Sequence, residues 1–278
     1  MESEECGVSN VWRFIDSGFL DGAANMAQDE ALIASFNPAA SLPVLRLYGW
    51  NPPAFSIGKF QDAGQALDLD RCKEAGIQVV RRVTAGGIIY HAEEVTYSIV
   101  CAPHHITEVR TVKESFRKLC GFLLLSYRKL GLDPAFAVDS HFPGVKLGER
   151  TALCFAGKEE YDIVIGGRKI GGNAQRRKKD IVFQHGSIPL RNCLTEALGF
   201  VRESAKSVSL EQGTVSLEEL GIATQVGPFK DILADCFQQC FAVTLLRSGL
   251  EPDEHQAASY LIKNKYSREM WNRYGQES

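Results

Sequence analysis

The sequence has no long apolar run. Its apolar stretches, residues 122–125 among them, are far shorter than the roughly 20 residues that cross a bilayer, so we expect no membrane span and no membrane partner. Residues 1–10 contain three Glu and neither Lys nor Arg, which is unlike a secretory signal peptide and favours a cytoplasmic location. The chain also lacks an excess of positive charge. Because 31 Lys and Arg stand against 34 Asp and Glu, the composition gives no reason to expect a nucleic-acid partner.

Motifs for metals and nucleotides are absent as well. The eight cysteines show no C-x-x-C spacing and the six histidines form no H-E-x-x-H, so we predict no metal site. Neither the pattern G-x-x-x-x-G-K-[ST] nor a strand-borne G-x-G-x-x-G occurs, so the usual glycine-rich loops that bind nucleotide phosphates are missing. A chain of 278 residues is long enough to bury a sizeable core without covalent cross-links, so we expect reduced thiols.

The chain instead contains helical and strand patterns without a regular βαβ repeat. Strands are predicted at residues 44–48, 54–57, 77–81, 95–100, 152–155, 161–165, 168–171 and 181–188. Helices are predicted at residues 21–36, 67–75 and 111–131, and most of the chain after residue 194 also has a helical pattern. This order indicates an α+β fold with a mixed, largely antiparallel sheet and flanking helices. No linker divides the chain, so we expect one domain at 1–250 with a helical tail, 251–278, packed on it.

Gly166 and Gly167 join two of the predicted strands. A Gly-Gly loop favours a primed turn because both positions accept positive φ, and such a turn fixes the register of the hairpin. Val164 then pairs with Lys169, on the face opposite the one that packs into the core, and Asp162 lies on the same face. From this pattern alone, Lys169 is either a solvated surface residue or part of a functional site.

Two segments combine small residues with arginine or other polar residues. The first contains Arg82, Thr84, Gly86 and Gly87, and the second is Gly171-Gly172-Asn173-Ala174, directly after the Lys169 strand. Small residues let a backbone approach a ligand closely and present its N–H groups, and neighbouring arginines indicate an anion or an extended ligand. Each segment taken alone is equally consistent with a simple turn or bulge.

Cys154, in the predicted strand at 152–155, is a candidate nucleophile. An unperturbed thiol with a pKa near ~8.5 is only a few per cent thiolate at neutral pH, and a nearby ammonium group would increase that fraction. Lys169, fifteen residues further along the chain, carries such a group. A buried structural thiol fits the same spacing, so both interpretations stay open at this point.

Taken together, these segments resemble the superfamily of lipoate–protein ligase A, octanoyltransferases and biotin–protein ligases, from about residue 12 to about residue 191. The matching motifs are Trp12-Arg13-Phe14-Ile15-Asp16, Leu45-Arg46-Leu47-Tyr48-Gly49-Trp50, Arg81-Arg82-Val83-Thr84-Ala85-Gly86-Gly87-Ile88-Ile89-Tyr90-His91 and Gly167-Arg168-Lys169-Ile170-Gly171-Gly172-Asn173-Ala174-Gln175. The third motif resembles the arginine- and glycine-rich acyl-binding loop of the family, and the fourth resembles its invariant-lysine segment. The segment Ala152-Leu153-Cys154-Phe155 is similar to that of octanoyltransferases which work through a cysteine thioester.

The resemblance implies a biotin/lipoate protein ligase-like catalytic fold and an acyltransferase of protein lipoylation. Cys154 would attack the thioester of an acyl carrier protein, while Lys169 polarises the carbonyl and favours the thiolate. The octanoyl or lipoyl group would then pass to a lysine of the glycine-cleavage H protein or another lipoyl-domain protein, without ATP or a metal. The implied acyl-binding residues are Arg82, Thr84, Gly86, Gly87, His91, Gly172 and Ala174.

Two other functions stay open. An ATP-dependent lipoate–protein ligase would use ATP and Mg to form a lipoyl-adenylate with the same lysine; the 87 residues after Arg191 argue against a full accessory domain. A non-catalytic binder of carrier domains would use the basic segment 175–179, which is otherwise a solvated hairpin tip. Ala85 in place of a family glycine and Ala92 in place of a common acidic residue leave the acyl chain length and the donor open.

Overall fold

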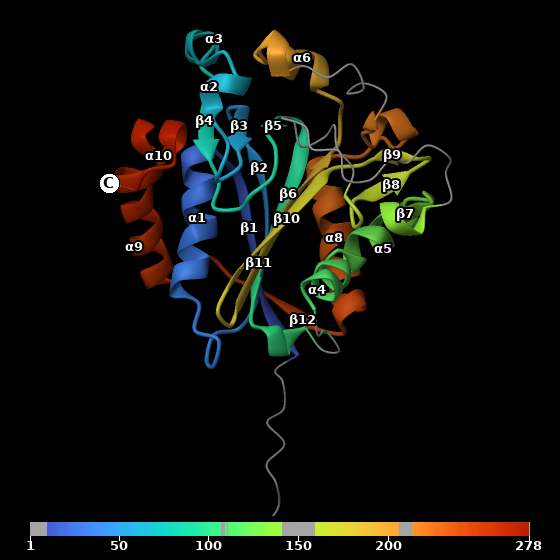
Figure 1. Cartoon of the computed structure of the whole chain (residues 1–278). Coiled ribbons are helices and arrows are strands. Elements are labelled where there is room, and N and C mark those ends of the chain that lie inside the picture. The colour runs from blue at the N-terminus through green and yellow to red at the C-terminus, as the bar shows by residue number, and fades with distance from the viewer. Residues whose placement is uncertain (1–9, 107–108, 110, 141–158, 206–212, 278) are drawn as a thin grey trace, which may run out of the picture.

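The computed structural model describes residues 10–106, 109, 111–140, 159–205 and 213–277. In this part of the chain a six-stranded sheet lies at the centre, with helices packed on both of its faces (Figure 1). Two three-stranded sheets accompany it, one near the top of the view and one at the right (Figure 1). The predicted strand at 152–155, and Cys154 with it, lies outside the described residues.

The strands of the central sheet are in the order β10-β11-β6-β2-β1-β12. Their bounds are β1 (Val11–Leu20), β2 (Val44–Trp50), β6 (Glu94–Cys101), β10 (Gly172–Lys178), β11 (Ile181–Pro189) and β12 (Thr244–Arg247). β1 pairs in parallel with β2 and β12, whereas the pairs β2–β6, β6–β11 and β11–β10 are antiparallel. The fold is therefore α+β with a mixed sheet, as the sequence predicts.

The two smaller sheets carry segments that the sequence marks as functional. One contains β4 (Gln78–Arg81), β3 (Ala54–Ile57) and β5 (Ile89–His91), so that the segment with Arg82 and its glycines connects two of its strands. The other contains β7 (Pro134–Phe136), β8 (Ile163–Ile165) and β9 (Arg168–Lys169). β9 leads directly into β10 of the central sheet, so Lys169 lies where the two sheets join.

The helices divide between the two faces of the central sheet (Figure 1). One face carries α1 (Gly22–Ser35), with α9 (Pro252–Leu261) and η5 (Ile262–Tyr266) packed against it. α10 (Glu269–Tyr274) packs on η5, β4 and α2 (Ala63–Ala66). The other face carries α4 (Val112–Leu119), α5 (Gly121–Lys129) and α8 (Val226–Phe241). Other short elements are α3 (Leu69–Glu74), α6 (Leu194–Leu198), η1 (Pro103–His105), η2 (Ala137–Asp139), η3 (Glu203–Ala205) and η4 (Glu218–Leu220). Among the described residues, none of these helices has the length and apolar character that a membrane crossing needs.

The core has two main parts because side chains alternate between the faces of each strand. On one face, apolar residues of the sheet pack against α5 and α8, including Trp12, Leu45, Tyr97, Phe122 and Phe237. On the opposite face, the sheet packs against α1, with Ile15, Val44, Val100, Leu32 and Phe36 buried together. The two layers hold the central sheet rigid, and the ends of its strands can then support a site.

Capping signals in the sequence account for two of the helices. α1 begins after Asp21, whose carboxylate accepts a hydrogen bond from the backbone N–H of Ala24. α4 begins with the predicted capping box. The Thr111 side chain accepts a hydrogen bond from the backbone N–H of Glu114, and the Glu114 side chain accepts one from the backbone N–H of Thr111. Both predicted helix starts are confirmed.

Several predicted boundaries are wrong. The helix predicted at 111–131 is divided at Cys120, and the following Gly121 lies so close to α8 that a Cβ there would be 3.0 Å from the Cys240 sulfur. The helix predicted at 67–75 begins only at Leu69, after the separate turn of α2. The strand predictions do not include β1, β5, β7, β10 and β12. β10 extends as far as Lys178, so only the end of the basic segment 175–179 forms the tip of the hairpin.

Arg81, at the end of β4, ties the C-terminal helices to the loop after β3. Its guanidinium donates hydrogen bonds to the backbone carbonyls of six residues: Gly58, Lys59, Gln61, Trp271, Asn272 and Arg273. The side chain is almost completely buried. The hydrogen bonds of Arg81 therefore fix the chain immediately before Arg82.

Candidate active site

A pocket of about 410 Å³ lies where β2, β6, β10 and β11 meet the small sheet of β3, β4 and β5. We call it the central pocket. It is lined by Met26, Tyr48, Trp50, Ser56, Arg82, Gly86, Ile89, His91, Thr96, Gly172, Asn173, Ala174, His185, Gly186 and Ser187. The lining is mainly apolar with a few polar groups, which is the composition expected for a site that binds a small apolar ligand in one orientation.

The structure brings most of the predicted binding residues together. Arg82, Gly86, His91, Gly172 and Ala174, from segments about 90 positions apart in the sequence, all line the central pocket. The first segment leads into β5 of the small sheet and the second begins β10 at the edge of the central sheet, and the two meet at the pocket. The roles of these residues in acyl binding stay predictions.

Thr84 and Gly87 do not line the pocket directly but contact residues that do. The hydroxyl of Thr84 lies 2.7 Å from Nε2 of His185, and the carbonyl of Gly87 accepts a hydrogen bond of 2.6 Å from Arg82. Arg82 also donates to the carbonyl of Ala85. The loop after Arg82 therefore curls around the Arg82 guanidinium, and these hydrogen bonds fix the conformation of the loop.

Asp29 of α1 is the centre of a buried polar network beneath the pocket. Its carboxylate accepts hydrogen bonds from Arg46, Tyr48 and Ser98, at 2.7 to 2.9 Å. Burial alone would raise the pKa of Asp29, but Arg46, His185 and Ser98 outweigh it and lower that pKa below its usual value. The carboxylate is therefore ionised at neutral pH and holds its partners in place.

His185 connects this network to the pocket. Its Nδ1 lies 3.7 Å from the Asp29 carboxylate, and its Nε2 contacts Thr84. Burial lowers the pKa of His185, against the opposing effect of Asp29, so the imidazole is neutral at pH 7. A neutral ring suits an apolar pocket because it adds no uncompensated charge to the lining.

A second network runs through His91 on the other side of the pocket. Its Nδ1 lies 2.7 Å from Glu94, and its Nε2 lies 2.7 Å from the hydroxyl of Ser56. The Trp50 indole stacks on the His91 ring at 3.9 Å between centroids. Burial alone would raise the pKa of Glu94, but His91, Ser187 and Thr96 outweigh it and lower that pKa. The network fixes the orientation of the aromatic wall that an apolar ligand would contact.

Lys169 is buried, not solvated. The β8–β9 hairpin has the predicted register, Val164 opposite Lys169, across a turn with positive φ at both glycines. The Lys169 ammonium forms an ion pair of 2.7 Å with Asp162, and only 3% and 5% of the two side chains are exposed. Asp162 also accepts a hydrogen bond from the backbone N–H of Glu159. The interpretation of Lys169 as a solvated surface residue is therefore wrong, since its buried ammonium is paired with a counterion.

Other residues of the site were not found by sequence reasoning. Asp29, Ser56, Glu94, Asp162 and His185 all belong to the networks around the pocket and the lysine. Asp162 had a usable signal, since the hairpin register already placed it on the face of Lys169. The others are polar residues within apolar elements, which is a signal of a buried network but does not reveal the partners.

Metal ligands do not gather in the described part of the chain. No group of three or more His, Cys, Asp or Glu side chains there has the arrangement of a metal site. The polar groups around the central pocket instead pair with one another.

The structure shows a buried lysine three residues before the strand residues that line a mainly apolar pocket, and Lys169 itself is not among the lining residues. Comparison with known proteins shows the family. Residues 21–238 match the lipoyl protein ligase A/B catalytic domain, so the chain belongs to that family. Among curated proteins, the octanoyltransferase LipM of Anoxybacillus flavithermus is 36% identical over 272 residues, which cover 94% of this chain and 98% of that protein. The octanoyltransferase LipM of Bacillus subtilis is 33% identical over 276 residues, with the same coverage.

Solved structures share the fold. A lipoate-protein ligase A bound with ATP superposes with a TM-score of 0.79 at 23% identity, covering 94% of this chain and 98% of the other. A putative lipoate protein ligase from T. acidophilum with bound lipoic acid has a TM-score of 0.77 at 24% identity, with 95% and 99% coverage. The predicted ligase-like fold is confirmed.

Proposed function

We propose that this chain moves an octanoyl group from acyl carrier protein to a lysine of a lipoyl-domain protein, with Cys154 as the intermediate acyl carrier. The chain is an octanoyltransferase of protein lipoylation, in agreement with relatives that match it along nearly its whole length. The donor, the acceptor and the thioester on Cys154 are our proposal. The observation that supports them best is the buried ion pair of Lys169 next to the strand that lines the central pocket.

In the first step, the thiolate of Cys154 attacks the carbonyl carbon of the donor thioester. The new C–S bond forms, the C–S bond to the carrier breaks, and the released carrier thiolate takes up the proton that the Cys154 thiol gave up. The Lys169 ammonium would stabilise both the thiolate and the developing oxyanion, and Asp162 holds it in position. The central pocket would hold the octanoyl chain during this exchange.

In the second step, the neutral amine of the acceptor lysine attacks the acyl-Cys154 carbonyl. An amide forms and the C–S bond to Cys154 breaks. The sulfur takes up the proton that the amine loses, so Cys154 is released as a thiol. We infer that neither ATP nor a metal is required because the thioester is already activated towards an amine. The acceptor we propose is the H protein of glycine cleavage or a similar lipoyl-domain protein.

The test is transfer of octanoate without ATP. Wild type is mixed with octanoyl-acyl carrier protein and a lipoyl domain, and the acyl adduct on the Cys154 peptide is sought by mass spectrometry. We expect the adduct in wild type and, in Cys154→Ala, a loss of at least about a thousandfold in transfer rate. Cys240→Ser is the matched control, since this half-buried thiol packs at Gly121 in α5, and it should keep the adduct and the rate.

Other results would point to the alternatives. Transfer that requires free octanoate and ATP, releases pyrophosphate and survives Cys154→Ala would establish a ligase. Salt-sensitive binding of the carrier proteins without any transfer, unchanged in Cys154→Ala and Lys169→Ala, would establish a non-catalytic binder. Either result would overturn the thioester proposal.

A further inference from the structure

Strand β5 separates the central pocket from a second cavity. Side chains alternate along a strand, and here Ile89 and His91 line the central pocket whereas Ile88 and Tyr90 line the other cavity. We call this second cavity the flanking pocket. The two pockets therefore share one thin wall, a single strand three residues long.

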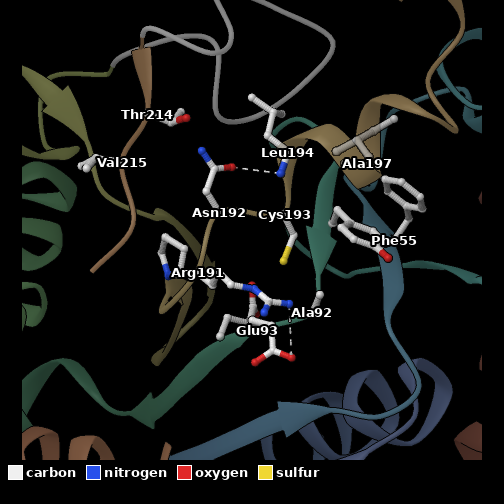
Figure 2. A pocket seen from close by; sticks show the side chains of 14 residues that line it. Phe55, Ala92, Glu93, Arg191, Asn192, Cys193, Leu194, Ala197, Thr214 and Val215 are labelled. Atoms are coloured by element: carbon white, nitrogen blue, oxygen red, sulfur yellow. Dashed lines mark hydrogen bonds and ion pairs between the residues drawn. The ribbon is translucent and has the colours of Figure 1, made fainter. Parts of the chain in front are cut away.

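The flanking pocket has the lining of a small-molecule site. Its empty space of about 670 Å³ includes part of the solvent at its open mouth. Its walls are mainly apolar and come from β5, from the chain after β11 and from the segment before η4. Figure 2 shows the sulfur of Cys193 turned into the space between Arg191 and Phe55. Nothing in the acyl-transfer chemistry described above uses this cavity.

The strand of Lys169 connects the two pockets. The backbone N–H of Val215 donates to the Lys169 carbonyl at 2.9 Å, and Thr214 forms a β-bridge with Lys169. Thr214 and Val215 line the flanking pocket, whereas Gly172, three residues after Lys169, lines the central pocket. A ligand that extends from one pocket to the other therefore passes the strand of the proposed catalytic lysine.

The rim of the flanking pocket carries a cation. The Arg191 side chain is 56% exposed and lies 3.9 Å from the Glu93 carboxylate, which is a loose ion pair (Figure 2). Asn192 stands next to it on the same rim (Figure 2). An exposed guanidinium at the mouth of an apolar cavity is suited to a ligand with an apolar arm and a phosphate at its outer end.

We propose that the flanking pocket binds the pantetheine arm of the acyl donor, with the phosphate of the arm at Arg191. The proposal rests on the function above, in which the donor is a carrier thioester. The octanoyl chain then occupies the central pocket and the arm occupies the flanking pocket, so the thioester that joins them lies at the strand of Lys169. This arrangement makes the enzyme recognise the donor on both sides of the bond that breaks.

A nucleotide fits this cavity less well. Glu93, whose carboxylate is exposed at the rim, belongs to its lining, and it would repel the several negative charges of a triphosphate. Among the described residues that line the pocket, Arg191 is the one Lys or Arg, which matches the single phosphate of a pantetheine arm. The apolar walls match the methyl and methylene groups of the arm.

The first experiment measures binding without catalysis and uses Cys193 as a reporter. The rate of alkylation of Cys193 by iodoacetamide is followed by peptide mass spectrometry with and without 4′-phosphopantetheine. We expect the ligand to slow alkylation at least fivefold in wild type and to have no effect on Cys240. In Ala92→Phe, whose new ring would occupy the flanking pocket, and in Arg191→Ala, the ligand should protect Cys193 less at the same concentration.

The second experiment compares two octanoyl donors in the transfer reaction. S-octanoyl-4′-phosphopantetheine has the whole arm, whereas S-octanoyl-N-acetylcysteamine has only its sulfur end. We expect Arg191→Ala to raise the KM of the first donor about fivefold relative to that of the second. Arg247→Ala is the matched control, since Arg247 also forms an exposed ion pair of 3.9 Å, with Asp231, and both donors should behave as in wild type.

The outcomes separate this proposal from the proposed function. Equal effects of Arg191→Ala on both donors, or Cys193 protection by ATP but not by 4′-phosphopantetheine, would overturn the pantetheine site and leave the octanoyl transfer intact. Absence of any transfer from either donor, with Cys193 still protected by 4′-phosphopantetheine, would overturn the transfer scheme and leave the binding site. Absence of protection in wild type overturns the site whatever the activity.

Discussion

Lys169 and Asp162 form an ion pair away from water, and each side chain depends on the other. Removing two charges from water costs several kcal/mol per ion, and the attraction over 2.7 Å offsets this only while both partners are present. The pair therefore fixes the ammonium at a defined place without adding much net stability. This is the behaviour expected of a group retained for chemistry.

Neutralising Asp162 should consequently be costly. Asp162→Asn keeps an acceptor for the Glu159 N–H but removes the counterion, and we expect the free energy of unfolding to fall by about 3–5 kcal/mol. Glu160→Gln, two residues away, removes the exposed pair with Lys113 and should cost far less, because exposed pairs contribute little to stability. Urea denaturation measures both values. Equal losses in the two variants would show that the Lys169 pair is not buried in solution.

At the level of elements, the junction of β9 and β10 is restricted by backbone geometry. Gly171 has φ +75°, and a Cβ on it would overlap the carbonyl oxygen of Ser187 in β11. The glycine therefore lets β10 lie close to β11 immediately after the Lys169 strand. The position of Gly172 in the pocket lining depends on this close approach.

Gly171→Ala should separate these strands. A left-handed backbone costs roughly 1–2 kcal/mol for a residue with a Cβ, and the clash with Ser187 adds to it, so we expect a loss of about 3 kcal/mol or more. Gly76→Ala is a matched control: it has φ +70° but no atom within 4 Å of its Cβ, and it should cost only about 1–2 kcal/mol. Thermal or urea unfolding gives both losses, and a similar loss in both variants would contradict the close packing.

At the scale of the whole molecule, what the sequence could predict depended on distance along the chain. The Gly166-Gly167 turn and the caps at Asp21 and Thr111 use partners within a few residues, and all three were predicted correctly. The contacts of Asp29 with Ser98 and of Thr84 with His185 join positions 69 and 101 residues apart, and no local pattern specifies them. The family resemblance identifies segments that line the pocket. It does not identify the buried polar side chains that hold those segments in place.

Stability towards acid is also a property of the whole fold. Burial and the neighbouring His104 lower the pKa of His105 to about 4, and burial lowers that of His185. Both folded-state pKa values lie below the usual value, so the unfolded chain binds more protons as the pH falls. The stability that the neutral forms of His105 and His185 contribute is fully present above about pH 6.5, the usual pKa of histidine. This contribution is lost as the pH falls towards the pKa values of the folded state.

We therefore expect the free energy of unfolding to decrease between pH 6.5 and pH 4. The Nδ1 of His105 accepts the backbone N–H of Ala102, and His105→Asn keeps an acceptor that does not titrate. This variant should lose less stability over that interval, whereas His255→Gln, at an exposed position, should follow wild type. Urea denaturation at several pH values tests this, and a curve for His105→Asn parallel to that of wild type would assign the acid sensitivity to other groups.

The six carbonyls bound by Arg81 belong to two segments that are far apart in the sequence. Three lie in the loop after β3 and three in α10, so one side chain joins the two. None of these six residues lines the central pocket. Replacing Arg81 would therefore release a helix and a loop from each other at a distance from the ligand, and the pocket would be affected only through the neighbouring Arg82.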